Sequence, residues 1–281
     1  MSYFSVAVLV TCFNRKDKTL ECLSRLFSQI IPETVSIAVH LVDDASTDDT
    51  ANAVRKSFPE VNVIPGSGSL FWNGGMRLAY KVASEKDPDF YLWLNDDTYL
   101  YEDALDRLVS EFLLLKQKGY DKSILVGSTQ DASTGSLTYG GVRRHSWWYP
   151  LKFICIEPDD SSKLCDTMHG NCVLVSRKAA ELVGNLDPSF VHHLTDFDYG
   201  LRARKEGCSI WLIPGFVGTC SFHEPNWREV GLSLREKFKQ INHPKGLPFS
   251  EWRIYAQRHG GPLWPVYWLS PYLRLVVTSI F

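Results

Sequence analysis

Two apolar runs, each ending in a pair of aspartates, constrain this chain more than any other feature. The run IAVHLVDD ends at Asp43 and Asp44, and the run FYLWLNDD ends at Asp96 and Asp97. Such runs are typical of strands in a parallel sheet that is covered on both faces, and ligands of such sheets bind beyond the carboxyl ends of the strands. Both pairs are therefore predicted to face one crevice. Clustered carboxylates there indicate a metal-assisted enzyme that acts on a phosphorylated ligand.

The order of the predicted elements indicates an α/β fold. Strand patterns alternate with helical patterns over the first 120 residues, and three further strand patterns follow. The strands are expected at 4–13, 36–42, 61–64, 90–94, 123–130, 172–176 and 208–215, and the helices at 17–29, 46–58, 74–86 and 101–119. This alternation predicts right-handed crossovers and a doubly wound, mostly parallel sheet.

Two local features refine this prediction. Ser46 or Thr47 is expected to cap the second helix, because their hydroxyls accept hydrogen bonds from backbone N–H groups at a helix start. The segment from Thr134 to Pro158 is irregular and aromatic, which predicts a hairpin or a loop over the crevice.

Composition excludes several classes of protein. The chain is 44% hydrophobic and 22% charged, which is ordinary for a globular protein with a sizeable core. Its formal net charge of -2 argues against a nucleic-acid partner, since non-specific affinity for nucleic acid needs a concentrated basic surface. Seven cysteines occur without a CxxC pair, and no secretory leader pattern opens the chain, so we expect a cytoplasmic protein with reduced thiols.

Two nucleotide-binding folds are excluded by their missing loops. A dinucleotide-binding fold needs a glycine-rich turn after its first strand, where this chain has TCFNRKDK without a glycine. The phosphate loop GxxxxGK[ST] of the P-loop nucleotidases is also absent from the sequence.

Five segments carry a more specific signal. In chain order they are TCFNR, VDDASTDDT, GSLFWNGGMRLAY, LNDDT and HLTDFDYGLRARKEG. Their order and spacing resemble the family 2 glycosyltransferases, bacterial rhamnosyltransferases among them, over the stretch from Phe4 to His223. The resemblance implies a GT-A fold and the transfer of a sugar, with inversion, from a nucleoside diphosphate sugar.

The first two segments are expected to bind the nucleotide. The resemblance gives Asp43 or Asp44 the task of accepting a hydrogen bond from a uracil or thymine N–H, while Thr11, Phe13 and Arg15 lie alongside the base and ribose. An alternative for the aspartate pair is that it caps the start of the following helix.

The third segment is expected to approach the pyrophosphate or the donor sugar. Gly74 and Gly75 allow close approach of the backbone, and a helix that begins there offers unpaired N–H groups to an anion. A plain loop-to-helix turn is the alternative. Asn73 and Arg77 match polar positions of the family, and Trp72 is either a platform for the donor sugar or a core residue.

The fourth segment departs from the family's DxD-type metal motif, because Asn95 replaces the first acid. The resemblance implies that Asn95 orients a ribose or phosphate, that Asp96 contacts the ribose and that Asp97 binds Mg²⁺ or Mn²⁺. An Asx turn is the structural alternative. His223 matches a late metal-binding histidine of related enzymes, although a lone histidine is more often structural.

The fifth segment resembles the family's EDxDxxxR pattern, in which an acid deprotonates the acceptor hydroxyl. Thr195 replaces the first acid, so Asp196 is the expected general base. Asp198 and Arg202 are expected to hold the helix and its base in position. Solvated charges on a capped helix are the alternative.

The predicted organisation has two parts. Residues 1–223 form the glycosyltransferase domain, with a nucleotide-binding half at 1–100 and an acceptor half at 101–223, and residues 224–281 form an irregular aromatic extension. Proline residues and Arg274 make a membrane-spanning helix a poor fit in the extension. An interfacial membrane anchor, an acceptor-binding lid and a homodimer contact are the three roles open to it.

The predicted function is that of an inverting glycosyltransferase of surface polysaccharide synthesis. It uses a UDP- or dTDP-sugar donor, a glycan or lipid-linked glycan acceptor and Mg²⁺ or Mn²⁺, in the cytoplasm or at the inner face of the cell membrane. Two alternatives remain open at this point. One is a nucleotidyltransferase that makes nucleotide sugars, and the other is a non-catalytic carbohydrate-binding relative.

Overall fold

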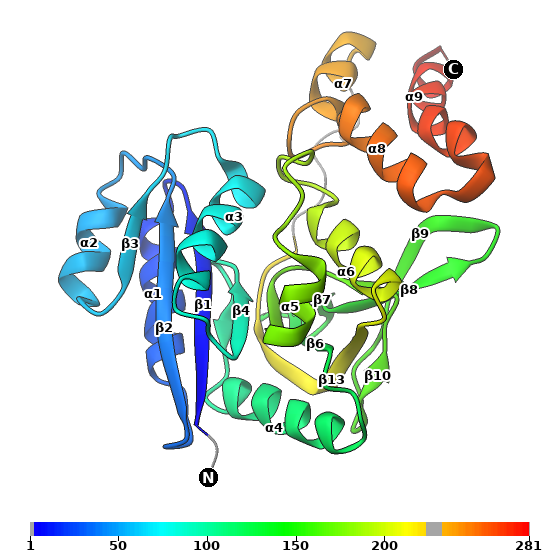
Figure 1. Cartoon of the computed structure of the whole chain (residues 1–281). Helices are drawn as coiled ribbons and strands as arrows, with labels where there is room; N and C mark the ends of the chain where they lie inside the picture. Colours follow the sequence, from blue (N-terminus) through cyan, green and yellow to red (C-terminus); the bar gives the residue numbers. More distant parts are fainter. Residues whose placement is uncertain (1–2, 223–231, 281) are drawn as a thin grey trace.

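A mixed sheet forms the centre of the computed structural model, which describes residues 3–222 and 232–280 (Figure 1). Its strands lie in the order β10-β13-β6-β12-β4-β1-β2-β3, while β5 pairs with β13 and β7 pairs with β6. Strands β3, β2, β1 and β4 are parallel, and β12 joins β4 in the antiparallel sense. The bounds of the parallel strands are β1 (Phe4–Cys12), β2 (Val35–Asp43), β3 (Asn62–Pro65) and β4 (Phe90–Leu94).

The other strands of this sheet extend it beyond β4. They are β5 (Tyr99–Leu100), β6 (Ser123–Gln130), β7 (Leu137–Tyr139), β10 (Lys163–Leu164), β12 (Cys172–Ser176) and β13 (Ser209–Thr219). The helices before the extension are α1 (Lys16–Phe27), α2 (Thr50–Ser57), α3 (Phe71–Ser84), α4 (Ala104–Gln117), α5 (Arg177–Val183) and α6 (Thr195–Lys205).

Both faces of the sheet are buried, as β1 illustrates. Val6, Val8 and Val10 contribute to a core cluster with residues of α1 and α4, whereas Ala7 and Leu9 contribute to a second cluster with residues of α3, α5 and α6. Successive side chains of a strand point to opposite faces, so a strand buried on both sides needs apolar residues at every position. The predicted doubly wound, mostly parallel sheet is confirmed.

The aromatic segment predicted as a hairpin or loop contains a hairpin. Strands β8 (Gly141–Ser146) and β9 (Tyr149–Cys155) pair in the antiparallel sense, and β11 (Thr167–Met168) adds to β8 as the third strand of a small second sheet. Figure 1 shows this hairpin reaching out beneath the C-terminal helices.

The extension is helical, so the predicted irregular segment is wrong for its described part. It contains α7 (Leu234–Ile241), α8 (Phe249–His259), the 3₁₀ turn η2 (Gly261–Leu263) and α9 (Trp264–Ile280). Trp252, Tyr255 and Ala256 recur at helical spacing and are buried, which supplies the packed face that most helices in proteins need for stability. Two of the three prolines between residues 261 and 281, Pro262 and Pro265, lie in first-turn positions where proline is tolerated.

The extension shares a core cluster with α6. Leu201 of α6 and Phe190 just before it belong to the same apolar cluster as Trp252, Tyr255 and Tyr272 of the extension. The carboxyl-terminal helices are thus packed on the helix that carries the expected general base.

Candidate active site

The carboxyl ends of neighbouring strands bring the predicted carboxylates to one edge of the sheet. Strand β1 lies between β2 and β4, so the loop that begins at Phe13 passes between the Asp43–Asp44 pair and the Asp96–Asp97 pair. The antiparallel strand β12 begins at the same edge, and Asn95 donates its backbone N–H to the carbonyl of Asn171 at 3.1 Å. The sequence prediction of one shared edge is confirmed.

Arg15 joins both carboxylates of the second pair. Its Nη1 donates to Oδ1 of Asp96 at 2.7 Å, and its Nη2 donates to Oδ2 of Asp97 at 2.8 Å. The fork of a guanidinium matches two acceptors well, and such charge-assisted bonds are stronger than neutral ones. In this structure Arg15 therefore supplies the positive charge that two adjacent buried carboxylates require.

Asp96 is the more perturbed member of this pair. It is buried, and its Oδ2 has no hydrogen-bond partner among the described residues. Burial raises the pKa of Asp96 to about 6, against the lowering effect of the Arg15 charge. The site thus holds a carboxylate that gains a proton just below neutral pH.

The first aspartate pair divides into two roles. Asp44 accepts backbone N–H groups from Gly68 at 2.7 Å, Leu70 at 2.8 Å and Phe71 at 3.2 Å, which are the residues that lead into α3. The carboxylate therefore caps that helix and stabilises its loop. Asp43 accepts the backbone N–H of Ser46 at 3.2 Å and lies at the end of β2, beside the loop after β1.

That loop is tied to the loop after β2 by Asn14, which the sequence suggested only as a turn former. Asn14 has a positive φ of 51°, accepts the backbone N–H of Thr47 at 2.7 Å, and donates its own backbone N–H to Ser46 Oγ at 2.8 Å. Helix α2 begins at Thr50, so the predicted cap by Ser46 or Thr47 is wrong. Both residues bind the neighbouring loop instead, which keeps Phe13, half exposed at 51%, at the rim of the site.

The start of α3 differs from the prediction. The helix begins at Phe71, so Gly74 lies inside it and donates its N–H to the carbonyl of Leu70 at 3.0 Å. The N–H of Phe71 is bonded to Asp44, and the N–H of Asn73 to the carbonyl of Val191. The expected free N–H groups at Gly74 and Gly75 are therefore not available to an anion, because the helix end is capped by the protein itself.

The two glycines of this segment serve close packing. A Cβ on Gly75 would lie 2.0 Å from Oγ1 of Thr11, so α3 approaches β1 only because this side chain is missing. Arg77 donates from Nε to the carbonyl of Leu186 at 3.1 Å, and Asn73 donates from Nδ2 to the carbonyl of Asp187 at 2.8 Å. These residues support the segment that precedes α6.

Trp72 connects the end of β4 to the start of α6. Its Nε1 donates to Oδ1 of Asn95 at 2.8 Å, and its ring lies so close to Gly170 that a Cβ there would be 2.8 Å from ring atoms. The N–H of Gly170 donates to Oδ2 of Asp196 at 2.9 Å. Asn95 thus orients Trp72, and the indole packs beside the residue whose backbone holds Asp196.

Asp196 and Asp198 have contrasting surroundings. Asp196 is half-buried and accepts backbone N–H groups from Gly170 at 2.9 Å and from Phe197 at 2.8 Å. Asp198 is fully buried and accepts from Nε of Arg202 at 2.8 Å and from Nε2 of His259 at 2.9 Å. Of these two residues, only Asp196 is accessible to solvent, and its carboxylate forms no ion pair with a cation of the described residues.

Asp198 receives a third bond, from Nη1 of Arg258 at 2.8 Å. Burial alone would raise the pKa of Asp198, but hydrogen bonds from His259 and Arg202 and the charges of Arg202 and Arg258 lower it below its ordinary value. Burial also lowers the pKa of His259, so its imidazole is neutral at pH 7. Asp198 is therefore a fixed anion between α6 and α8.

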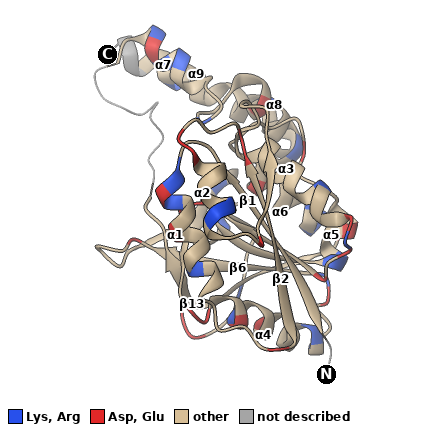
Figure 2. Cartoon of the chain, turned by 90° about the vertical axis from the view of Figure 1, so that its left-hand side faces the viewer, with Lys and Arg blue, Asp and Glu red and all other residues tan. Residues whose placement is uncertain are grey.

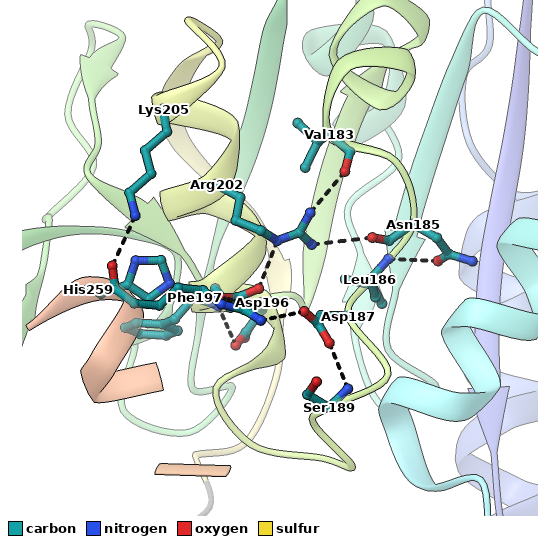
Figure 3. A network of polar contacts seen from close by, with 12 residues as sticks. Val183, Asn185, Leu186, Asp187, Ser189, Asp196, Phe197, Arg202, Lys205 and His259 are labelled. Atoms are coloured by element: carbon teal, nitrogen blue, oxygen red, sulfur yellow. Dashed lines mark hydrogen bonds and ion pairs between the residues drawn. The ribbon is translucent and has the colours of Figure 1, made fainter. Parts of the chain in front are cut away.

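The same network reaches the segment before α6 (Figure 3). Arg202 donates to the carbonyls of Val183 at 2.9 Å and Asn185 at 3.3 Å. Arg258 pairs with Asp187 at 2.8 Å, and Glu251 of α8 accepts the N–H of Val191 at 3.0 Å. Sequence reasoning missed Glu251, Arg258 and His259, and no motif near them could have marked them as part of the site.

A fourth missed residue, His169, lies near Asp196. His169, which precedes β12, donates to the carbonyl of Gly140 from its backbone N–H at 3.0 Å and from Nδ1 at 3.1 Å. Burial lowers the pKa of His169, while the nearby charge of Asp196 opposes that shift. A neutral imidazole therefore accompanies the half-buried Asp196.

The donor set at the Arg15 cluster fits a hard cation in part. Asp97 and the unpartnered Oδ2 of Asp96 are carboxylate oxygens, the ligands that Mg²⁺ and Mn²⁺ prefer. Within residues 3–222 and 232–280 no three His, Cys, Asp or Glu side chains gather as a metal-binding group. His223, the other predicted ligand, lies outside the described residues. A metal here would depend on oxygens of the ligand as well as of the protein.

The sheet, its covering helices and this edge define a GT-A-type α/β protein. Residues 7–183 match the family described as Glycosyl transferase family 2, and the chain belongs to that family. The chain is 24% identical over 200 residues to the N-acetylglucosaminyl-diphospho-decaprenol L-rhamnosyltransferase of Mycobacterium tuberculosis. That match covers 63% of this chain and 62% of the length of the relative.

Solved structures share the fold. Mannosyltransferase PcManGT from Pyrobaculum calidifontis, in complex with GDP-Man and Mn²⁺, has a TM-score of 0.57 and 16% identity, with 98% of this chain and 69% of that chain covered. TarS 1–349 of S. aureus, in complex with UDP-GlcNAc, has a TM-score of 0.55 and 14% identity, with 90% of this chain and 71% of that chain covered.

Proposed function

We propose that this protein is an inverting glycosyltransferase that moves a sugar from a UDP- or dTDP-sugar to a glycan or lipid-linked glycan acceptor, as in surface polysaccharide synthesis. The observation that carries this proposal is the half-buried carboxylate of Asp196, held by two backbone N–H groups beside Trp72. It lies at the same sheet edge as the Arg15, Asp96 and Asp97 cluster, so one crevice offers a base and a charged nucleotide-binding end.

Asp43 is the proposed partner of the base N–H. The carboxylate of Asp44 accepts hydrogen bonds from the loop before α3. Asp43 is therefore the member of the pair that can bind a ligand. Thr11 near the end of β1, and Phe13 and Arg15 in the loop that follows, supply the wall for base and ribose. TarS, a structural neighbour, has been solved with UDP-GlcNAc, which supports a uridine nucleotide as the first donor to test.

Metal dependence is proposed from the donor set. Asp97 would hold Mg²⁺ or Mn²⁺, with Asp96 beside it and diphosphate oxygens completing the shell. The bound ion would supply positive charge for the departing diphosphate. Arg15 already bridges both carboxylates, so it is placed to turn toward the phosphates when a cation takes over its partners. The Mn²⁺ in the complex of the neighbour PcManGT supports this assignment.

The transfer step assigned to Asp196 is a single displacement. The acceptor oxygen forms a bond to the anomeric carbon, the bond from that carbon to the diphosphate oxygen breaks, and its electron pair leaves with the diphosphate. The acceptor hydroxyl gives its proton to Asp196. The N–H of Gly170, which lies against the ring of Trp72, holds one oxygen of this carboxylate.

The proposed acceptor and location are supported by a curated relative. The M. tuberculosis relative is named as acting on N-acetylglucosaminyl-diphospho-decaprenol, which supports a lipid-linked acceptor and therefore work at the cytoplasmic face of the membrane, with the extension as the contact. Within the described residues no helix is long and apolar enough to cross a bilayer. We keep the division into a catalytic part, 1–223, and an extension, 224–281, as part of this proposal.

The test is a screen of UDP- and dTDP-sugars for release of UDP or dTDP, with Mg²⁺, with Mn²⁺ and with a chelator. We expect metal-dependent release that increases with a lipid-linked or short glycan acceptor, and a product with inverted anomeric configuration by NMR. Formation of a nucleotide sugar from a nucleoside triphosphate would identify a nucleotidyltransferase instead. Tight sugar binding without release of nucleotide under any condition would identify a non-catalytic relative.

A further inference from the structure

The tip of the β8–β9 hairpin is an exposed aromatic group. Trp147, Trp148 and Tyr149 are 74%, 62% and 59% exposed, and the two indoles stack with ring centroids 3.6 Å apart. Three adjacent exposed aromatic side chains are costly to keep in water, and Trp and Tyr are the residues that favour the boundary between lipid and water.

Helix α9 has one apolar face that residues 3–222 and 232–280 leave exposed. Val266, Leu269, Leu273 and Val277 recur at spacings of three and four residues, and their exposures are 61%, 40%, 61% and 55%. The opposite face packs into the extension through residues such as Tyr272. An amphipathic helix whose outer face is apolar is typical of a helix that lies in an interface.

The hairpin tip and α9 are in direct contact. Tyr267, on the flank of α9, donates from Oη to the carbonyl of Trp148 at 2.7 Å. Together they form what we call the docking face, which consists of Trp147, Trp148, Tyr149, Val266, Leu269, Leu273 and Val277. The two parts come from segments more than 100 residues apart, yet one hydrogen bond fixes them side by side.

The surroundings of the docking face are basic. Residues 232–280 contain seven Lys or Arg and two Asp or Glu, although the whole chain has 30 basic and 32 acidic residues. Both acids are engaged within the protein, since Glu236 caps α7 through Ser233 and Glu251 accepts from Val191. Figure 2 shows Lys and Arg on α7, the first helix of the extension. Arg143 and Lys152 are exposed on the hairpin itself. This positive charge around the docking face favours an anionic partner.

The stem of the same hairpin packs on the proposed base. Phe153 of β9 contacts Phe197, the neighbour of Asp196, with ring centroids 5.2 Å apart. At the other strand, the carbonyl of Gly140, just before β8, bonds to His169. A partner that binds the hairpin tip would therefore lie near Asp196 rather than near the Arg15 cluster.

We propose that the docking face seats this enzyme on a bilayer that contains anionic lipid. Trp147, Trp148 and Tyr149 enter the headgroup region, the apolar face of α9 lies along it, and the basic residues of the extension contact the anionic headgroups. The membrane contact itself does not depend on the proposed function. Its consequence does rest on that function: a lipid-linked acceptor would reach Asp196 at the surface of the bilayer.

Vesicle flotation tests this with the full chain. The probes are vesicles of phosphatidylcholine alone and of equal parts phosphatidylcholine and phosphatidylglycerol. We expect the parent to float with the anionic vesicles, less with the neutral ones and less as salt rises. The double variants Trp147→Ser/Trp148→Ser and Leu273→Ser/Val277→Ser should each lower the bound fraction roughly fivefold or more, because each removes part of the apolar contact.

Ile30→Ser and Leu114→Ser are the matched controls, since both residues are exposed and apolar, at 64% and 50%, but lie near α1 and on α4. UDP affinity and the melting temperature report whether each variant is folded. Flotation of the double variants equal to that of the parent would overturn the proposal. So would a concentration-dependent dimer, formed without lipid and lost in the double variants, because the face would then bind a second copy of the chain.

The same experiment separates this inference from the proposed function. If the parent floats but no nucleotide sugar is turned over, the docking face stands and the glycosyltransferase assignment fails. If the parent transfers sugar to a water-soluble acceptor but never binds anionic vesicles, the enzyme assignment stands and the docking face fails.

Discussion

The proposed donor side and the proposed acceptor side of the sheet edge are held in place by different parts of the fold. On the donor side the partners come from loops at the same edge of the sheet. Residues 68–71 donate hydrogen bonds to Asp44, and Arg15, after the adjacent strand, pairs with Asp96 and Asp97. On the acceptor side Asp198 is held by His259, 61 residues later. The donor side is therefore part of the sheet itself, whereas the acceptor side is completed by the extension.

This difference predicts two kinds of variant. Changes on the donor side should alter nucleotide or metal binding with the acceptor helix intact. Changes in the extension should slow transfer and loosen α6 with nucleotide binding intact.

The largest effect is expected at the metal position. Asp97→Ala should lower metal-dependent transfer by about a thousandfold or more, because the diphosphate loses the charge held there, worth several kcal/mol in the transition state. Titration of Mn²⁺ in the presence of UDP should show no saturation, while the far-UV circular dichroism stays that of the parent. Normal turnover of this variant in a chelator would remove the metal from the account.

A smaller effect is expected in the extension. His259→Ala removes one of the three donors to a buried carboxylate and should cost about 1–3 kcal/mol of stability. We expect kcat to fall roughly tenfold with unchanged UDP affinity and to be partly restored by His259→Gln, whose amide can donate in its place. Arg253→Ala is the control from the same helix, because its guanidinium lies over Trp268 and not on α6. Equal losses in both variants would mean that the helix merely needs to be intact.

Acid pH should weaken the donor side first. Since burial raises the pKa of Asp96 to about 6, the folded protein binds this proton below pH 6, whereas the unfolded chain binds it only below about 4. The contribution of Asp96 to stability therefore grows as pH falls from 6 to 4, while its ability to attract Arg15 or a cation is lost. We expect the affinity for Mn²⁺ with UDP to fall about tenfold between pH 6 and pH 5 without unfolding. In Asp96→Asn this limb of the profile should be absent.

The smallest functional effect is expected at Asp44. Asp44→Asn keeps one acceptor oxygen for three backbone donors and should lower the free energy of unfolding by about 1–3 kcal/mol, with donor affinity within about threefold of the parent. Asp43→Asn is the comparison and should weaken UDP about tenfold, the value of one hydrogen bond to an ionised group. Calorimetric titration of UDP distinguishes the two, and the reversed pattern would exchange their roles.

The same division explains what the sequence could predict. The strands and the shared edge were predictable because near-continuous apolar runs, such as the one that contains Val6, Val8 and Leu9, indicate burial on both faces. The start of α3 was not, since Asp44 caps it from 26 residues earlier and draws three residues before Gly74 into the helix.

The acceptor side was predictable only in part. Asp196 and Asp198 were recognised together by resemblance, but nothing local reveals that one is open and the other fully buried. That distinction depends on Arg258 and His259, which carry no motif. The aromatic content of the extension was visible in the sequence, whereas its packing on the hairpin was not, since it depends on long-range contacts such as the hydrogen bond from Tyr267 to Trp148 and the packing of Phe153 against the apolar cluster of the extension.

The central claim is that Asp196 accepts the acceptor proton while Asp198 only holds its helix, and single-turnover transfer by two amide variants tests it most directly. Asp196→Asn keeps the shape of the side chain but cannot accept the proton. Transfer should fall by roughly two to four orders of magnitude with UDP affinity and melting temperature unchanged. Asp198→Asn should lower the melting temperature and slow transfer far less. If Asp198→Asn abolished transfer while Asp196→Asn left it intact, the assignment of the base would be contradicted.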